Sequence, residues 1–108
     1  MNIAISSTGP SLDDEVDARF GRCQCFIVTD TDTGKSEVLN NAGSSSGGAG
    51  IAAAQMIVAG GIKAVLTGKC GPNATRVLSE SGVRIVSGVT GKVGVAIGIF
   101  KAGGYAAE

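Results

Sequence analysis

The chain has 108 residues, nine basic and nine acidic side chains, and no histidine. This length predicts a single domain spanning residues 1–108, and the balanced charge argues against nucleic acid as a partner. The absence of histidine excludes imidazole ligands and histidine bases, and no run approaches the roughly 20 apolar residues that a membrane span needs.

The first half of the chain predicts three short strands joined by polar segments. The expected strands are residues 3–5, 26–29 and 36–39. The last two are separated by Asp32-Thr33-Gly34, which is typical of a hairpin turn. Residues 11–22 are polar, with acids first and arginines last. Residues 41–50, rich in serine and glycine, are expected to be flexible, either as a lid over a site or as plain disorder.

The second half alternates between helical and strand patterns. The expected elements are a helix over residues 51–59, a strand over 64–67, a helix that starts at Pro72 and ends near Gly82, and a strand over 83–86. Residues 93–100 fit both a strand and a helix. We favour a helix with Thr90 as its N-cap, because a sixth strand would need a free pairing edge.

Strand directions follow from these connections. The first and third strands run one way, the second runs the other, and helical crossovers make the fourth and fifth strands parallel to the first. Four segments then meet at one edge: residues 6–9, 19–25, 41–50 and 67–73. Such an edge is the usual ligand site of an open α/β sheet, and the N-termini of two helices there favour an anion.

The three cysteines fall at this predicted edge. Cys23 and Cys25 are two residues apart, which in a strand would place both sulfur atoms on one face. Cys70 precedes a helix and follows Lys69, and both features lower a thiol pKa. The thiols are therefore candidate metal ligands, although buried cysteines also serve as small hydrophobic residues. Their odd number and the lack of an export signal predict reduced thiols in the cytoplasm.

Cations accompany the cysteines. Three thiolates suit an iron–sulfur cluster with one open iron, or a single zinc or copper ion with an outside ligand. Arg19, Arg22 and Lys69 would then bind the negative charge of such a cluster. Alternatively, the two arginines neutralise the acids at positions 13–17.

Four motifs in chain order carry a family resemblance. They are the N-terminal Met1–Ile5, Arg-Phe-Gly-Arg at 19–22, Gly-Ala-Gly at 48–50, and Thr-Gly-Lys-Cys-Gly-Pro-Asn-Ala at 67–74. Together they resemble the dinitrogenase iron–molybdenum cofactor biosynthesis family, which includes NifX and the C-terminal part of NifB. The resemblance implies a three-layer ribonuclease H-like fold with sheet order 3-2-1-4-5, the second strand antiparallel, and about three helices.

The resemblance also implies a function. It predicts a non-enzymatic protein that binds or carries a metal–sulfur cluster or an iron–molybdenum-type precursor, with metallocluster assembly proteins as partners and a P-loop ATPase as one candidate. The expected cofactor-binding residues are Arg19, Phe20, Gly21, Arg22, Gly48, Gly50, Lys69, Gly71 and Asn73, and the expected metal ligands are Cys23, Cys25 and Cys70. The alternative is a metal-free interaction or regulatory module for such a partner.

Overall fold

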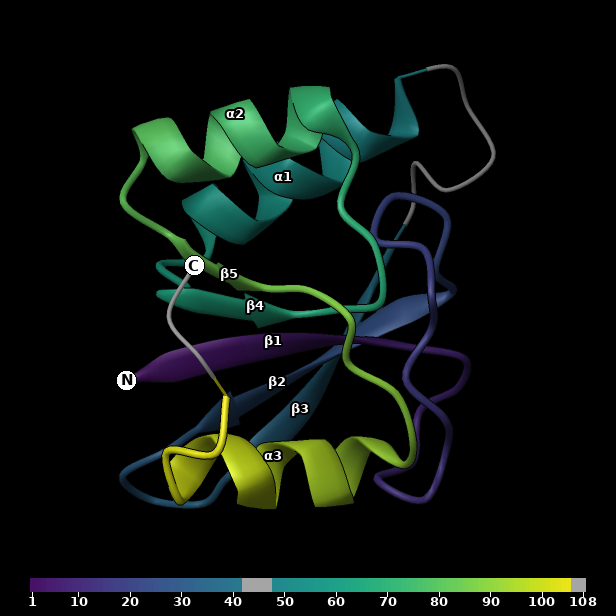
Figure 1. The fold of residues 1–108 in the computed structure, drawn as a ribbon, viewed down its shortest axis with the longest axis vertical. Coiled ribbons are helices and arrows are strands. Elements are labelled where there is room, and N and C mark those ends of the chain that lie inside the picture. The colour runs from purple at the N-terminus through teal and green to yellow at the C-terminus, as the bar shows by residue number, and fades with distance from the viewer. Residues whose placement is uncertain (42–47, 106–108) are drawn as a thin grey trace.

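The computed structural model describes residues 1–41 and 48–105, and it has three layers. A five-stranded sheet lies between two helices on one face and a third helix on the other (Figure 1). In chain order the elements are β1 (Asn2–Ser7), β2 (Cys25–Asp30), β3 (Ser36–Asn40), α1 (Ala49–Ala59), β4 (Ala64–Leu66), α2 (Pro72–Glu80), β5 (Arg84–Val86) and α3 (Val93–Lys101). Residues 42–47, where a lid was expected, lie outside the described residues.

The sheet confirms the predicted topology. Its strand order is β3-β2-β1-β4-β5, with β2 antiparallel to both of its neighbours and β4 parallel to β1 and β5. Ile5 is paired with Ile27 on one side and with Leu66 on the other. The loops after β1 and β4 therefore leave the sheet at the same edge, beside the start of β2.

The alternation of side chains along the strands divides the core into two layers. In β1, Ala4 packs toward α1 and α2, whereas Ile3 and Ile5 pack toward α3. Small side chains such as Ala53 and Ala54 let α1 lie close to the sheet. Both layers are completely buried at these positions, so the sheet is a rigid support for the loops at its edge.

The third helix resolves the ambiguity of residues 93–100 in favour of a helix. Its N-cap is Lys92, so the prediction of Thr90 as the cap was wrong. The first amides of the helix are instead bonded by a distant loop: Val93 N–H donates to the carbonyl of Asp14 (2.9 Å) and Gly94 N–H to that of Leu12 (2.8 Å).

Among the described residues, no helix has the length and apolarity needed to cross a bilayer.

Candidate functional site

A cavity lies where the predicted loops meet. Its volume is about 410 Å³, and it is lined by Ala18, Arg19, Phe20, Gly21, Gly50, Lys69 and Gly71. We call this cavity the edge pocket. It combines the loop before β2, the first turn of α1 and the loop that leads into α2. Residues from three of the four segments that were predicted to converge line the pocket, whereas residues 6–9 do not.

Two of the loops are joined by backbone pairing. Arg19 and Lys69 form an isolated parallel bridge, and Phe20 N–H donates to the carbonyl of Lys69 (3.1 Å). A Cβ atom at Gly68 would lie only 2.6 Å from Cα of Ala18, so glycine is needed for this approach. The pairing places two cationic residues next to each other beside the edge pocket.

The same loop also packs against the start of α1. A Cβ atom at Gly21 would lie 2.7 Å from both Cα and N of Gly50. The side-chain amide of Asn41 donates to the carbonyl of Gly21 (3.1 Å) and holds the loop from the other side. Gly21 therefore allows the arginine-bearing loop to touch the first turn of a helix.

Two helix N-termini face the edge pocket through Gly50 and Gly71. Gly48 is the N-cap of α1 and Gly71 that of α2, and neither helix has a side-chain cap bond among the described residues. The first-turn amides of a helix have no partner within the helix, and its N-terminus carries partial positive charge. In α3 the corresponding amides are bonded by loop carbonyls, as described above. The edge pocket is therefore suited to an anion.

Phe20 anchors this site to the core. Its side chain is almost fully buried, and its ring centroid lies 5.2 Å from that of Phe26 in β2. Burial of an aromatic ring contributes a large apolar area and fixes the backbone that carries it. Phe20 thus fixes the backbone of the loop that carries the exposed side chains of Arg19 and Arg22.

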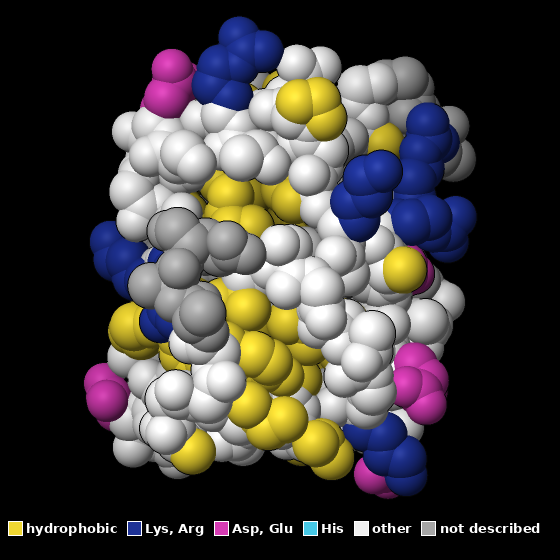
Figure 2. Space-filling view, viewed as in Figure 1, with side chains coloured by type: hydrophobic (Ala, Val, Ile, Leu, Met, Phe, Trp, Pro, Cys, Tyr) yellow, Lys and Arg dark blue, Asp and Glu magenta, His cyan; other side chains and the backbone are white. Residues whose placement is uncertain are grey.

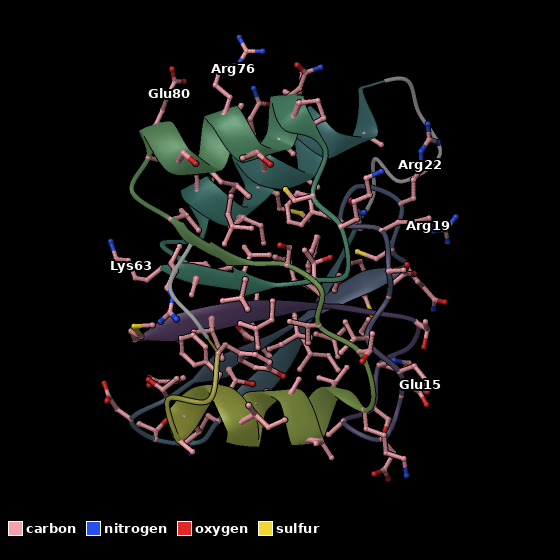
Figure 3. The ribbon with its side chains drawn as sticks, viewed as in Figure 1. Glu15, Arg19, Arg22, Lys63, Arg76 and Glu80 are labelled. Atoms are coloured by element: carbon pink, nitrogen blue, oxygen red, sulfur yellow. The ribbon has the colours of Figure 1, made fainter. Side chains whose placement is uncertain are left out.

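Positive charge gathers around this edge. Figure 2 shows lysine and arginine side chains grouped on the right of the view, where Figure 3 places Arg19 and Arg22. Arg19 is 68% exposed in its side chain and has one ion pair, from Nε to the Asp17 carboxylate at 3.5 Å. A larger cavity of about 450 Å³ near the β2–β3 turn is lined by two carboxylates, of Asp30 and Glu37, and by one cation, Lys35, so its charge favours an anion less than that of the edge pocket.

The remaining predicted binding residues lie nearby but do not line the edge pocket. Gly48 precedes the first turn of α1, and Arg22 follows the pocket-lining Gly21. The side-chain oxygen of Asn73 accepts a hydrogen bond from Arg76 (3.0 Å) on the exposed side of α2.

Sequence reasoning missed three residues of the site: Ala18, Gly68 and Asp17. The closeness of Ala18 to Gly68 joins loops about 50 positions apart, and no local pattern reveals such a contact. Asp17 did leave a signal. An Asp two residues before Arg19 is the spacing at which an aspartate side chain accepts a bond from a backbone amide.

The cysteines do not gather in the edge pocket. Cys23 lies in the core layer beneath α1 and α2. Cys25 is the first residue of β2, two positions before Ile27, so the alternation of side chains places it on the same face of the strand as Ile27, which packs toward α3. The expectation that both sulfur atoms share a face was wrong, because Cys23 precedes the strand and the strand rule does not apply to it. Their sulfur atoms bond different carbonyls, of Phe20 and of Gly9, each at 3.3 Å.

The third thiol faces a separate cavity. Cys70 lines a space of about 290 Å³ between α2 and β5, together with Thr75, Ser79, Val83, Arg84, Ile85 and Ser87. Its neighbours Lys69 and Gly71 line the edge pocket instead. Among the described residues, no group of three or more cysteine, aspartate or glutamate side chains is arranged to hold a metal ion.

Burial keeps the thiols protonated. It raises the pKa of Cys23 to about 12, with a further contribution from the Asp17 charge, and it also raises the pKa of Cys25. The pKa of Cys70 is raised as well, because burial outweighs the hydrogen bond from Thr75. The expected lowering of the Cys70 pKa by Lys69 and the helix N-terminus was therefore wrong.

Comparison with known proteins agrees with the fold. Residues 1–103 match the family described as dinitrogenase iron-molybdenum cofactor. The apo form of the orange protein from Desulfovibrio gigas is 36% identical, with a TM-score of 0.95 over 99% of this chain and 92% of that one. A putative NifB protein from Thermotoga is 32% identical, with a TM-score of 0.85 over 98% and 91%. No curated protein matches significantly.

A more distant structure shows how well the fold is maintained. A putative dinitrogenase from Methanocaldococcus jannaschii is 19% identical, with a TM-score of 0.76 over 100% of this chain and 94% of that one. The three-layer fold and the edge pocket place the chain in a class of small α/β proteins whose loops meet at one edge of the sheet. The chain belongs to the dinitrogenase iron–molybdenum cofactor family, as the four sequence motifs predicted.

Proposed function

We propose that this protein binds and carries an anionic metal–sulfur cluster or an iron–molybdenum-cofactor precursor during metallocluster assembly. The supporting observation is the edge pocket, in which two uncapped helix N-termini meet Arg19 and Lys69. Its volume of about 410 Å³ is within the range of small-ligand sites. Family membership supports a role in the same area of chemistry.

The pocket lining indicates how the ligand is held. The lining residues include two cations and several glycines, but no carboxylate and no thiol. Such a site binds negative charge through backbone amides and charge-assisted hydrogen bonds rather than through coordination bonds.

Direct ligation by Cys23, Cys25 and Cys70 is a separate proposal about the same ligand. It requires the three thiols to lose their protons and to move together. Cys23 and Cys70 both pack in the core layer beneath α1 and α2, but the three sulfur atoms have different surroundings: Cys23 bonds the carbonyl of Phe20, Cys25 bonds that of Gly9, and Cys70 lines the cavity between α2 and β5. The site supports outer-sphere binding better. The two modes predict different effects of substitution, which the experiment below separates.

Partners and location complete the proposal. The protein would exchange its ligand with other cofactor-assembly proteins in the cytoplasm. The described residues contain no feature that favours a P-loop ATPase over other assembly partners.

The test is an anaerobic titration with tetrathiomolybdate, a molybdenum–sulfur dianion that needs no protein ligand. The Arg19→Gln/Lys69→Gln variant should weaken binding at least about ten-fold, since two charge-assisted contacts are lost. Affinity of the wild-type protein should fall as salt rises. The matched control is Arg76→Gln/Lys101→Gln, which removes the same charge from α2 and from the end of α3.

The result for Cys70→Ala decides the mode of binding. Outer-sphere binding predicts an affinity within about two-fold of wild type. A large loss in Cys70→Ala together with unchanged affinity in Arg19→Gln/Lys69→Gln would show that thiolates hold the ligand. Equal losses in the charge variant and its control would show that the edge pocket is not the site.

A further inference from the structure

The carboxylate of Asp17 is buried directly before the arginine-bearing loop. The residue is only 6% exposed, and a buried carboxylate is costly unless it is hydrogen-bonded. One of its oxygens, Oδ1, accepts a bond from the backbone amide of Arg19 (2.9 Å) and also lies 3.5 Å from Nε of the same residue. A single carboxylate oxygen thus contacts both the main chain and the guanidinium of Arg19.

Asp17 is itself fixed to the sheet. Its amide donates to the carbonyl of Ser6 in β1 (2.8 Å), and its carbonyl accepts from the Ser6 hydroxyl (2.7 Å). That hydroxyl also lies 2.7 Å from the hydroxyl of Thr67, which is buried just after β4. Asp17 is therefore held by the two strands whose ends define the edge.

Arg19 needs such support to hold one position in the empty protein. Its side chain is largely exposed, and ordering a free arginine costs about 1.5–2 kcal/mol of side-chain entropy. Contact through Nε uses one donor of the guanidinium, which has five N–H groups in all, so both Nη groups stay available to a ligand. Figure 3 shows Arg19 projecting from the edge of the sheet.

We propose that Asp17 is the positioning residue of the edge pocket: it holds Arg19 beside Lys69, ready to bind an anion. This inference rests on the proposed function and concerns a residue that does not itself line the edge pocket. The opposing effect is electrostatic, because a carboxylate near the pocket also repels an anion. When the charge of Asp17 is removed, the loss of positioning weakens anion binding, whereas the loss of repulsion strengthens it.

A double-mutant cycle with tetrathiomolybdate separates these effects. Asp17→Asn keeps an oxygen that can accept the Arg19 amide but removes the charge that attracts Nε. We expect it to weaken binding about five-fold in the wild-type background and not at all in the Arg19→Ala background. Asp13→Asn is the matched control, because it removes an exposed carboxylate from the same loop.

Three results would overturn the proposal. They are a gain of affinity in Asp17→Asn, an equal loss in both backgrounds, or an equal loss in Asp13→Asn. The first would show that repulsion dominates, and the second that Asp17 acts independently of Arg19. The third would show a field effect without positioning.

The Nε–H signal of Arg19 tests the same inference in the empty wild-type protein. Its hydrogen exchange should be slower than that of Arg76, whose bond to Asn73 uses Nη2 instead. If wild-type protein fails to bind the anion, the proposed function is wrong, and this signal alone decides whether Asp17 positions Arg19. Equal exchange at the two arginines would show that it does not.

Discussion

At the scale of single residues, the site depends on positions where no side chain fits. Gly21 touches the backbone of Gly50, so Gly21→Ala must push the arginine-bearing loop away from α1. Overpacking against backbone typically costs about 1–3 kcal/mol. We therefore expect Gly21→Ala to lower the free energy of unfolding by that amount in urea denaturation, and to weaken anion binding as well.

Gly71→Ala is the matched control for this prediction. Gly71 has an ordinary φ of −66°, and a Cβ atom there meets nothing within 4 Å. The unfolding free energy of the Gly71→Ala variant should stay within about 0.5 kcal/mol of the wild-type value. Equal stabilities of the two variants would show that the loop yields freely at Gly21.

The second prediction at this scale concerns the buried thiol of Cys23. Its pKa is about 12 in the folded protein, against an ordinary value of 9.0. The unfolded thiol therefore loses its proton first as pH rises, and the stability from this group, complete below pH 9, is lost between about pH 9 and 12. The slope is at most roughly 1.4 kcal/mol per pH unit.

Urea denaturation at pH 8 and pH 10 measures this effect. The difference in unfolding free energy between the two pH values should be larger for wild type than for Cys23→Ala, because only wild type carries the buried thiol. Other groups that titrate in this range contribute equally to both proteins. The same pH dependence in both would mean that Cys23 ionises normally in the folded state.

The cysteines also show where local reasoning ends. The side-chain alternation that predicted a shared face for Cys23 and Cys25 holds only inside a strand, and β2 begins at Cys25. Sequence neighbours favoured a thiolate at Cys70, but the fold partly buries its side chain against the core between α2 and β5. Burial is a tertiary property, so no local pattern could predict it.

At the scale of elements, none of the three helices has a side-chain cap bond among the described residues, but α3 differs from α1 and α2 in that loop carbonyls bond its first amides. A glycine at the N-cap of α2 gives up stability that a capping side chain would provide. Its extended backbone, with φ −66° and ψ 164°, is the conformation that capping residues adopt. We infer that the first-turn amides are kept available for a ligand.

Gly71→Asp tests this inference. The carboxylate should cap α2 and favour its dipole, which raises the free energy of unfolding by about 0.5–2 kcal/mol relative to Gly71→Ala. It should also weaken tetrathiomolybdate binding, because it occupies the same amides with the same sign of charge. Gly71→Asn separates capping from charge. Unchanged affinity in both Gly71→Asp and Gly71→Asn would show that the α2 N-terminus does not contact the ligand.

At the scale of the whole molecule, the sequence predicted the strand directions because each connection limits the direction of the next strand. The order of the strands was implied by the family resemblance, and the structure confirms it. The hairpin at residues 32–34 set β3 antiparallel to β2, and the helical crossovers set β4 and β5 parallel to β1. The convergence of the loops at one edge followed from these directions. The N-terminal bonds of α3 did not, because they join residues about 80 positions apart.

The most direct test of the edge pocket is a map of amide chemical shifts during titration with tetrathiomolybdate. The perturbed amides should be those of residues 18–22, 49–51, 69–71 and 73–74, which surround the pocket. Amides of α3 and of the turn at residues 31–35 should not move. Perturbations centred on the cavity beside Cys70, or on the carboxylate-lined cavity at the β2–β3 turn, would contradict the account.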